Sequence, residues 1–169
     1  MKSTRFSRNV MTLMAGNIIA QAIPIAISPI LTRIYSPDDF GVFALYVSFS
    51  VILSSIATAR YELAVMLPKN DNDAFSLVVL SVLIALLMSV VIFLILYIFN
   101  LQIVDYLNNK DISNWLFFVP ITVFLTGIYQ SLYYWNLRNK NFKVVSVSNV
   151  TQGIGASSSN VLYGFSGFG

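Results

Sequence analysis

Long apolar stretches separated by short polar segments run through the whole chain. A membrane-spanning helix needs about 20 predominantly apolar residues. Five stretches meet this requirement, at residues 10–31, 40–59, 74–99, 115–135 and 144–169. The pattern predicts an all-α, polytopic membrane helix bundle of about five transmembrane helices. The fifth stretch reaches the last residue without a charged flank, so we expect the chain to be an N-terminal fragment of a longer protein.

Polar residues recur at helical spacing on several of these spans. In the first, Asn17, Gln21, Pro24 and Ser28 fall on one helix face. Packing between helices explains rows of Ser and Thr, but an amide in hydrocarbon needs a partner or water. We therefore expect spans one, two, four and five to line a polar interior and the third, with only scattered serines, to face lipid. The amides on which this depends are Asn17, Gln21, Gln130, Asn149 and Gln152.

Two prolines, Pro24 and Pro29, lie inside the first span. Each removes a backbone hydrogen bond of the helix. A static kink and a broken helix that lines a transport pathway are both consistent with them.

Opposite charges stand near the end of the second span, in TARYELAVMLPK (58–69). If the helix continues to Leu67, Arg60 and Glu62 point to opposite sides, about 200° apart, so they do not pair with each other. Each then needs its own partner on another helix, a ligand or water. Charges kept inside a membrane boundary usually face a bundle interior or a cavity, and we favour that over a pair at the membrane interface.

Composition agrees with a membrane protein and narrows the chemistry. The chain is 57% apolar and 10% charged, against about 45–50% and about 25% in soluble domains. Cysteine and histidine are absent, which excludes disulfides, thiolate nucleophiles and Cys/His zinc sites. The carboxylates show no spacing typical of an acid/base pair or a metal site, so we expect no enzyme activity, no metal and no cofactor. No basic run is dense enough to follow nucleic-acid phosphates.

The distribution of Lys and Arg favours one orientation. With a cytoplasmic N-terminus, the inside segments hold eight of these residues and the outside loops hold two, as the positive-inside rule requires. We therefore expect the N-terminus in the cytoplasm. The eight are Lys2, Arg5, Arg8, Arg60, Lys69, Arg138, Lys140 and Lys143; the two are Arg33 and Lys110.

Three stretches resemble the O-antigen and polysaccharide flippases, a branch of the multidrug/oligosaccharidyl-lipid/polysaccharide exporter superfamily. They are PILTRIYSPDDFGVFALYVS (29–48), ATARYELAVMLPKNDNDA (57–74) and YYWNLRNKNFKVVSVSNVTQ (133–152). The resemblance implies that the chain forms most of the first six-helix half of a two-bundle transporter. It also implies a multi-pass protein of the bacterial inner membrane.

The function implied by this resemblance is translocation of an undecaprenyl-diphosphate-linked oligosaccharide, an O-antigen or capsule repeat unit, by alternating access. The implied partners are this lipid-linked oligosaccharide, membrane lipids, a coupling ion (Na⁺ or H⁺) and a polysaccharide polymerase complex. The expected substrate-binding residues are Arg60, Glu62, Asn17, Gln21 and Gln130. The expected gating or structural residues are Arg33, Asp39, Pro24, Pro29 and Arg138.

Three other functions stay open at this point. An ion-coupled small-molecule exporter of the same superfamily would be favoured by an acid deep in the first span, which has none. A membrane polysaccharide polymerase or ligase usually has a large outside loop, and the longest one expected here, about residues 100–114, is short. A structural membrane subunit without a transport role is the third.

Overall fold

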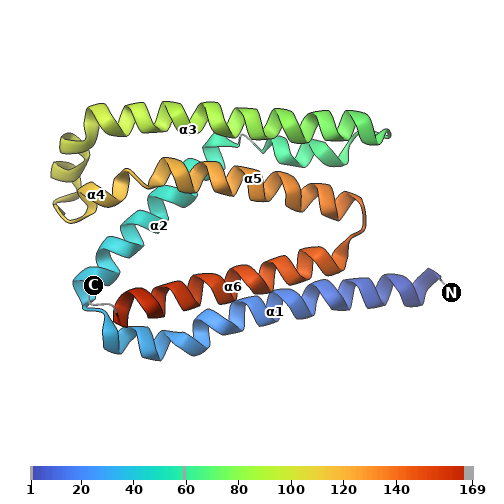
Figure 1. The fold of residues 1–169 in the computed structure, drawn as a ribbon, viewed down its shortest axis with the longest axis horizontal. Helices are drawn as coiled ribbons and strands as arrows, with labels where there is room; N and C mark the ends of the chain where they lie inside the picture. The colour runs from blue at the N-terminus through green and yellow to red at the C-terminus, as the bar shows by residue number, and fades with distance from the viewer. Residues whose placement is uncertain (1, 59, 166–169) are drawn as a thin grey trace. The chain divides into compact units, whose positions relative to one another are not determined.

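A computed structural model of the chain describes residues 2–58 and 60–165, and these are helical throughout apart from short turns (Figure 1). The predicted all-α fold is confirmed. The helices are α1 (Lys2–Ile34), α2 (Pro37–Ala57), the 3₁₀ helix η1 (Tyr61–Met66), α3 (Asp71–Leu107), α4 (Ile112–Leu116), α5 (Val119–Arg138) and α6 (Phe142–Phe165).

Among the described residues, four segments are long and apolar enough to cross a membrane. They are Val10–Ile34, Pro37–Ala57, Asp71–Leu107 and Ile112–Arg138. Helix α6 has 24 residues but is not one of the four, because Ser, Thr, Asn, Gln and Gly make up much of its sequence. Residues 166–169 of the fifth expected span, and the last residue of the second, lie outside the described residues.

The chain forms two compact units, one containing residues up to Phe40 together with those from Asn139 onward, and the other Gly41–Arg138. In the first unit, α1 packs along α6 (Figure 1). Ser146 donates a hydrogen bond to the Thr12 carbonyl near the start of both helices, and Tyr35 donates one to the Asn160 carbonyl near their ends. The two helices are therefore parallel.

Helix α1 continues unbroken through Pro24 and Pro29. The turn that follows it is closed by reciprocal hydrogen bonds at the start of α2. The Ser36 backbone N–H donates to Asp39 Oδ2 over 2.8 Å, and the Asp39 N–H donates to Ser36 Oγ over 3.2 Å. This is a capping-box arrangement, which satisfies backbone donors at a helix N-terminus.

In the second unit, α3 and α5 run antiparallel, with η1 packed against both. One face of α3 is buried, and Ser81, Ala85 and Ser89 lie on it. Ser89 donates a hydrogen bond to the Pro120 carbonyl of α5 over 2.7 Å. This face therefore packs on α5, because small residues let the two helices approach closely; the expectation that the third span faces lipid stays a prediction for its other faces. The other faces of α3 expose large apolar side chains.

Helix α3 is longer than the expected span and continues to Leu107. The prediction of a loop at residues 100–114 is therefore wrong for its first half, which is helical. Asn100 lies inside the helix, buried, and donates a hydrogen bond to the Ser113 carbonyl over 3.1 Å. The Ser113 hydroxyl donates back to Asn100 Oδ1 over 2.8 Å. These two bonds hold α4 against the end of α3. The fourth expected span, 115–135, is interrupted at residues 117–118, between α4 and α5.

A hydrophobic core joins α2 to α3, α4 and α5 near this end of the second unit. Its buried members are Ala57, Ile92, Leu96, Val104, Ile112, Leu116, Val119 and Val123. The core lies toward the α3–α4 turn, so the η1 segment at the other end of α3 is held by different contacts.

Candidate functional site

The second span ends in a helix break, and this break is the candidate functional site. Helix α2 stops at Ala57, and Arg60 takes the left-handed conformation, with φ 59° and ψ 20°. The chain then continues as η1 to Met66. An α-helix that runs on to Leu67 is therefore ruled out. We call residues 60–68 the η1 segment.

The η1 segment begins well inside the helical unit. A Cβ built on Gly127 would lie 3.8 Å from the Thr58 methyl group, so Thr58 lies beside the middle of α5. Gly127 precedes Arg138, the end of α5, by eleven residues, which is about 16 Å at 1.5 Å per residue. The η1 segment therefore runs beside α3 and α5, from the middle of α5 toward its C-terminal end.

The two charges of the η1 segment differ sharply in exposure. Arg60 is exposed, whereas Glu62 is buried, with 3% of its surface accessible. In a 3₁₀ helix, residues three apart lie above one another. Glu62 therefore shares a face with Val65, which is completely buried. Glu62 Oε2 has no hydrogen-bond partner among the described residues.

Arg138, at the end of α5, fastens the other end of the η1 segment. Its Nη1 donates to the Pro68 carbonyl over 2.5 Å, with a longer contact of 3.4 Å to the Val65 carbonyl. Its Nη2 forms a salt bridge of 3.1 Å with Asp71 Oδ1 at the start of α3. Arg138 thus joins α5, the η1 segment and α3. Its Nε is buried and has no partner in the described part of the chain.

The Asp71 contact is the weakest part of this arrangement. The Asp71 side chain is 77% exposed, whereas that of Arg138 is 14% exposed. Exposed ion pairs contribute little, whereas a hydrogen bond from a charged donor to a protein acceptor contributes about 1.5–3 kcal/mol. The carbonyl of Pro68 is therefore the main acceptor for Arg138.

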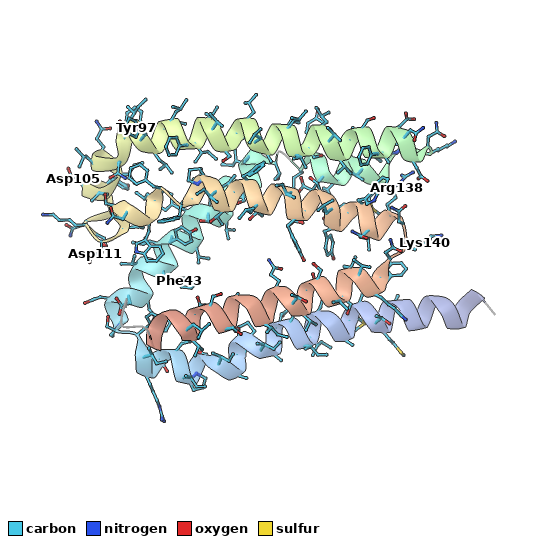
Figure 2. The ribbon with its side chains drawn as sticks, viewed as in Figure 1. Phe43, Tyr97, Asp105, Asp111, Arg138 and Lys140 are labelled. Atoms are coloured by element: carbon cyan, nitrogen blue, oxygen red, sulfur yellow. The ribbon has the colours of Figure 1, made fainter. Side chains whose placement is uncertain are left out.

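Charged residues of both signs lie at each end of the second unit, with Asp71 and Asp73 at the start of α3 and Lys110 between α3 and α4. Figure 2 shows Asp105 and Asp111 at the end where α3 meets α4, and Arg138 at the opposite end. Lys69 follows the η1 segment directly and so lies at the Arg138 end.

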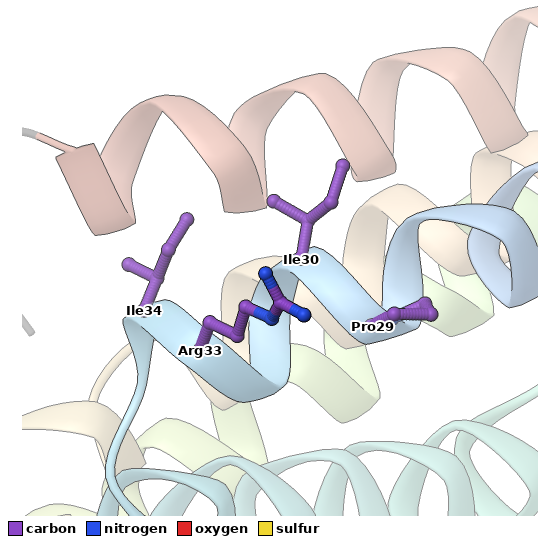
Figure 3. Close-up of a pocket in the computed structure, with 4 residues that line it drawn as sticks. All are labelled: Pro29, Ile30, Arg33 and Ile34. Carbon is purple, nitrogen blue, oxygen red and sulfur yellow. The ribbon is translucent and has the colours of Figure 1, made fainter.

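The expected site residues on α1 belong to the first unit. Asn17 is exposed and accepts a 2.6 Å hydrogen bond from Asn149 of α6. Gln21 and Pro24 are also exposed. Pro29 and Arg33, with Ile30 and Ile34, line an open cavity of about 450 Å³ near the end of α1; Figure 3 shows both isoleucines pointing toward α6.

Of the expected substrate-binding residues, the structure brings together only those of the second unit. Gln130 is half-buried on α5, which packs against the η1 segment that carries Arg60 and Glu62. The sequence interpretation missed the role of Asp71 and of the Pro68 carbonyl as acceptors for Arg138. The available signal was Pro68 itself, which ends a short apolar run and leaves backbone carbonyls without helical donors. In the described residues, no group of three or more acidic side chains could hold a metal ion.

Comparison with protein families gives a match over most of the chain. A family model described as "Polysaccharide biosynthesis protein" matches residues 6–161 of the 169. Neither the curated proteins nor the solved structures contain a match.

Proposed function

The chain belongs to the polysaccharide biosynthesis protein family, and from this premise we propose that it is part of a flippase for an undecaprenyl-diphosphate-linked oligosaccharide. The cargo is an O-antigen or capsule repeat unit, and the route crosses the bacterial inner membrane by alternating access. The observation that carries the proposal is the presence of four segments apolar enough to span a membrane in a polysaccharide biosynthesis protein. A lipid-linked precursor must cross the membrane, and the segment between α3 and α4, residues 108–111, is shorter than the large outside loop usual in a membrane polysaccharide polymerase or ligase.

The chemistry of the cargo assigns a role to Arg60. A diphosphate cannot cross hydrocarbon without compensation of its charge, while the prenyl tail can remain in lipid. Arg60 is exposed and follows Thr58, which lies beside the middle of α5. A guanidinium forms paired, charge-assisted hydrogen bonds with phosphate oxygens. Arg60 is therefore the residue that meets the diphosphate.

The amides supply hydrogen bonds for the sugar in the same proposal. Asn17 and Gln21 are exposed on α1, and Gln130 is half-buried on α5. Glu62 is buried, and in this proposal it serves a partner pair or the coupling ion. A coupling ion, Na⁺ or H⁺, and a complex with the polysaccharide polymerase complete the proposal.

The directions of α1 and α6 are compatible with five crossings, and the distribution of Lys and Arg favours a cytoplasmic N-terminus in this proposal. Successive spans alternate in direction, so a first and a fifth span run the same way, as the parallel α1 and α6 do. With a cytoplasmic N-terminus, the alternation of spans along the chain places Lys69 and Arg138 on the inside and Lys110 on the outside. This distribution follows the positive-inside rule.

The test replaces Arg60 in the native bacterium and measures surface polysaccharide at matched levels of membrane protein. We expect Arg60→Ala to reduce export about tenfold or more, the loss that follows from removing one charge-assisted hydrogen bond. Arg60→Lys retains part of the activity because the charge remains. Lys69→Ala, which removes a neighbouring exposed cation, leaves export unchanged. Normal export by Arg60→Ala would refute the role of Arg60.

A further inference from the structure

Two charged side chains border the η1 segment, the buried Glu62 and the partly exposed Arg138, and each has a buried atom without a hydrogen-bond partner in the described residues. These atoms are Glu62 Oε2 and Arg138 Nε. A buried ion normally has a partner of opposite charge, because the interior solvates it poorly. One of these atoms is an acceptor and the other a donor, so each has the chemistry that the other lacks.

The other charged groups near the η1 segment do not supply a partner for Glu62. On the segment and the turn after it, Arg60 and Lys69 are exposed. On α3, Asp71 and Asp73 are exposed and have the wrong sign. On α5, Arg138 is the one charged residue. Its side chain is only 14% exposed, so Arg138 is the cation best placed to meet a buried carboxylate.

The contacts of Arg138 place its guanidinium beside the η1 segment, within one 3₁₀ turn of the Glu62 position in the chain. Arg138 already contacts the Val65 carbonyl, at 3.4 Å. Glu62 lies on the same face as Val65, one 3₁₀ turn away, which is about 6 Å along the axis. Both side chains are long, so a meeting of the two requires rotamer changes and no unfolding of α5 or η1.

We propose that Arg138 exchanges partners between the carbonyl of Pro68 and the carboxylate of Glu62. In the arrangement described, Arg138 holds the end of the η1 segment to α5 and α3. In the second arrangement it pairs with Glu62 and releases Pro68 and Asp71. The η1 segment is then free to shift along α5 and to carry Arg60 with it.

The functional meaning of this exchange rests on the proposed flippase activity, because the segment that moves carries the residue assigned to the diphosphate. The pairing itself does not depend on transport. It can be measured on the purified chain in a lipid bilayer, so failure of the exchange and failure of the flippase proposal give different results.

The composition of the chain makes the measurement specific. Glu62 is the only glutamate in the sequence, so a chain labelled with ¹³C at the glutamate carboxyl carbon has a single reporter. Arginine labelled with ¹⁵N in its guanidinium then provides the second nucleus. Solid-state NMR dephasing of the carbon signal by nitrogen shows a guanidinium within ion-pair range, about 4 Å.

We expect dephasing in the natural sequence, its loss in Arg138→Lys, whose nitrogen is not labelled, and its retention in Arg60→Lys. Absence of dephasing in the natural sequence overturns the proposal. Dephasing that survives Arg138→Lys also overturns it, because the partner is then another arginine. Circular dichroism of each variant verifies that the helices are present.

Discussion

Replacing Gly127 with alanine will force α3 and α5 apart. A Cβ at this position would lie 2.4 Å from the Ala85 Cβ, far inside van der Waals contact, and Ala85 is completely buried. The next nearest atoms, Ala85 Cα and the Thr58 methyl carbon, are 3.8 Å away. The overlap is therefore with a single methyl group, and removing that methyl group should relieve it.

The magnitudes follow from these distances. Overpacking a close helix contact destabilises by about 1–3 kcal/mol, so we expect this loss for Gly127→Ala. Ala85→Gly alone removes a packed methyl group, which costs about 0.8 kcal/mol of stability. It also places a glycine inside a helix, which costs about 0.5–1 kcal/mol more. The double variant only moves one methyl group across the interface. We expect it to lie within about 1 kcal/mol of the natural chain, well below the sum of the single losses.

The assay is the free energy of unfolding of the purified chain in mild detergent, titrated with denaturing detergent and followed by circular dichroism. Gly41→Ala is the matched control, because a Cβ on Gly41 meets nothing within 4 Å. A double variant that loses the full sum of the two single losses would show that Gly127 and Ala85 are not in contact, and would refute the described packing of α3 on α5.

Two further predictions use the same titration. Gly153→Ala places a Cβ 2.7 Å from the Ala20 carbonyl oxygen and should lower the free energy of unfolding by about 1–3 kcal/mol. Gly155→Ala is the control and should leave that free energy unchanged, because nothing lies within 4 Å of its Cβ. Equal losses in the two variants would contradict the parallel packing of α1 on α6. Asn100→Leu removes both hydrogen bonds to Ser113 and should cost about 1–3 kcal/mol. Adding Ser113→Ala should recover part of that loss, and no recovery would count against the reciprocal pair.

Much of the fold could be predicted because long apolar stretches leave few alternatives. A stretch of about 20 apolar residues must satisfy its backbone internally, which makes it a helix. The lengths of the helices were less predictable, since α3 continues to Leu107 through polar positions such as Asn100. Asn100 is compatible with a helix only because Ser113 satisfies its amide, and a contact of that kind is invisible in a hydropathy pattern.

The packing face of α3 illustrates a second limit. Ser81, Ala85 and Ser89 recur every four residues, the same spacing that identified polar faces on the other spans. The hydropathy pattern shows only scattered serines there, because the residues around them are strongly apolar. Two properties make this the packing face: small size, since Gly127 leaves room for Ala85, and a hydrogen bond from Ser89 to a backbone carbonyl of α5.

The candidate site was only partly predictable, because its geometry depends on a break in the helix. The sequence places Arg60 and Glu62 near the end of a span, and an α-helix would have turned them to opposite sides. The left-handed residue Arg60 and the 3₁₀ helix after it instead leave Arg60 exposed and Glu62 buried. The end of the η1 segment is fastened by Arg138, which lies 70 residues after Pro68.

The charges around the η1 segment do not all have the same explanation. A helix that stops inside a membrane bundle leaves backbone carbonyls without donors, and Arg138 supplies a donor to the carbonyl of Pro68. Backbone satisfaction thus accounts for Arg138 by itself. It does not account for Glu62, because a carboxylate cannot donate to a carbonyl and its Oε2 has no partner in the described structure. An apolar residue at position 62 would fill the same buried space at lower cost. The buried acid is therefore the residue whose presence requires a functional reason, and a second arrangement in which Arg138 pairs with it supplies one.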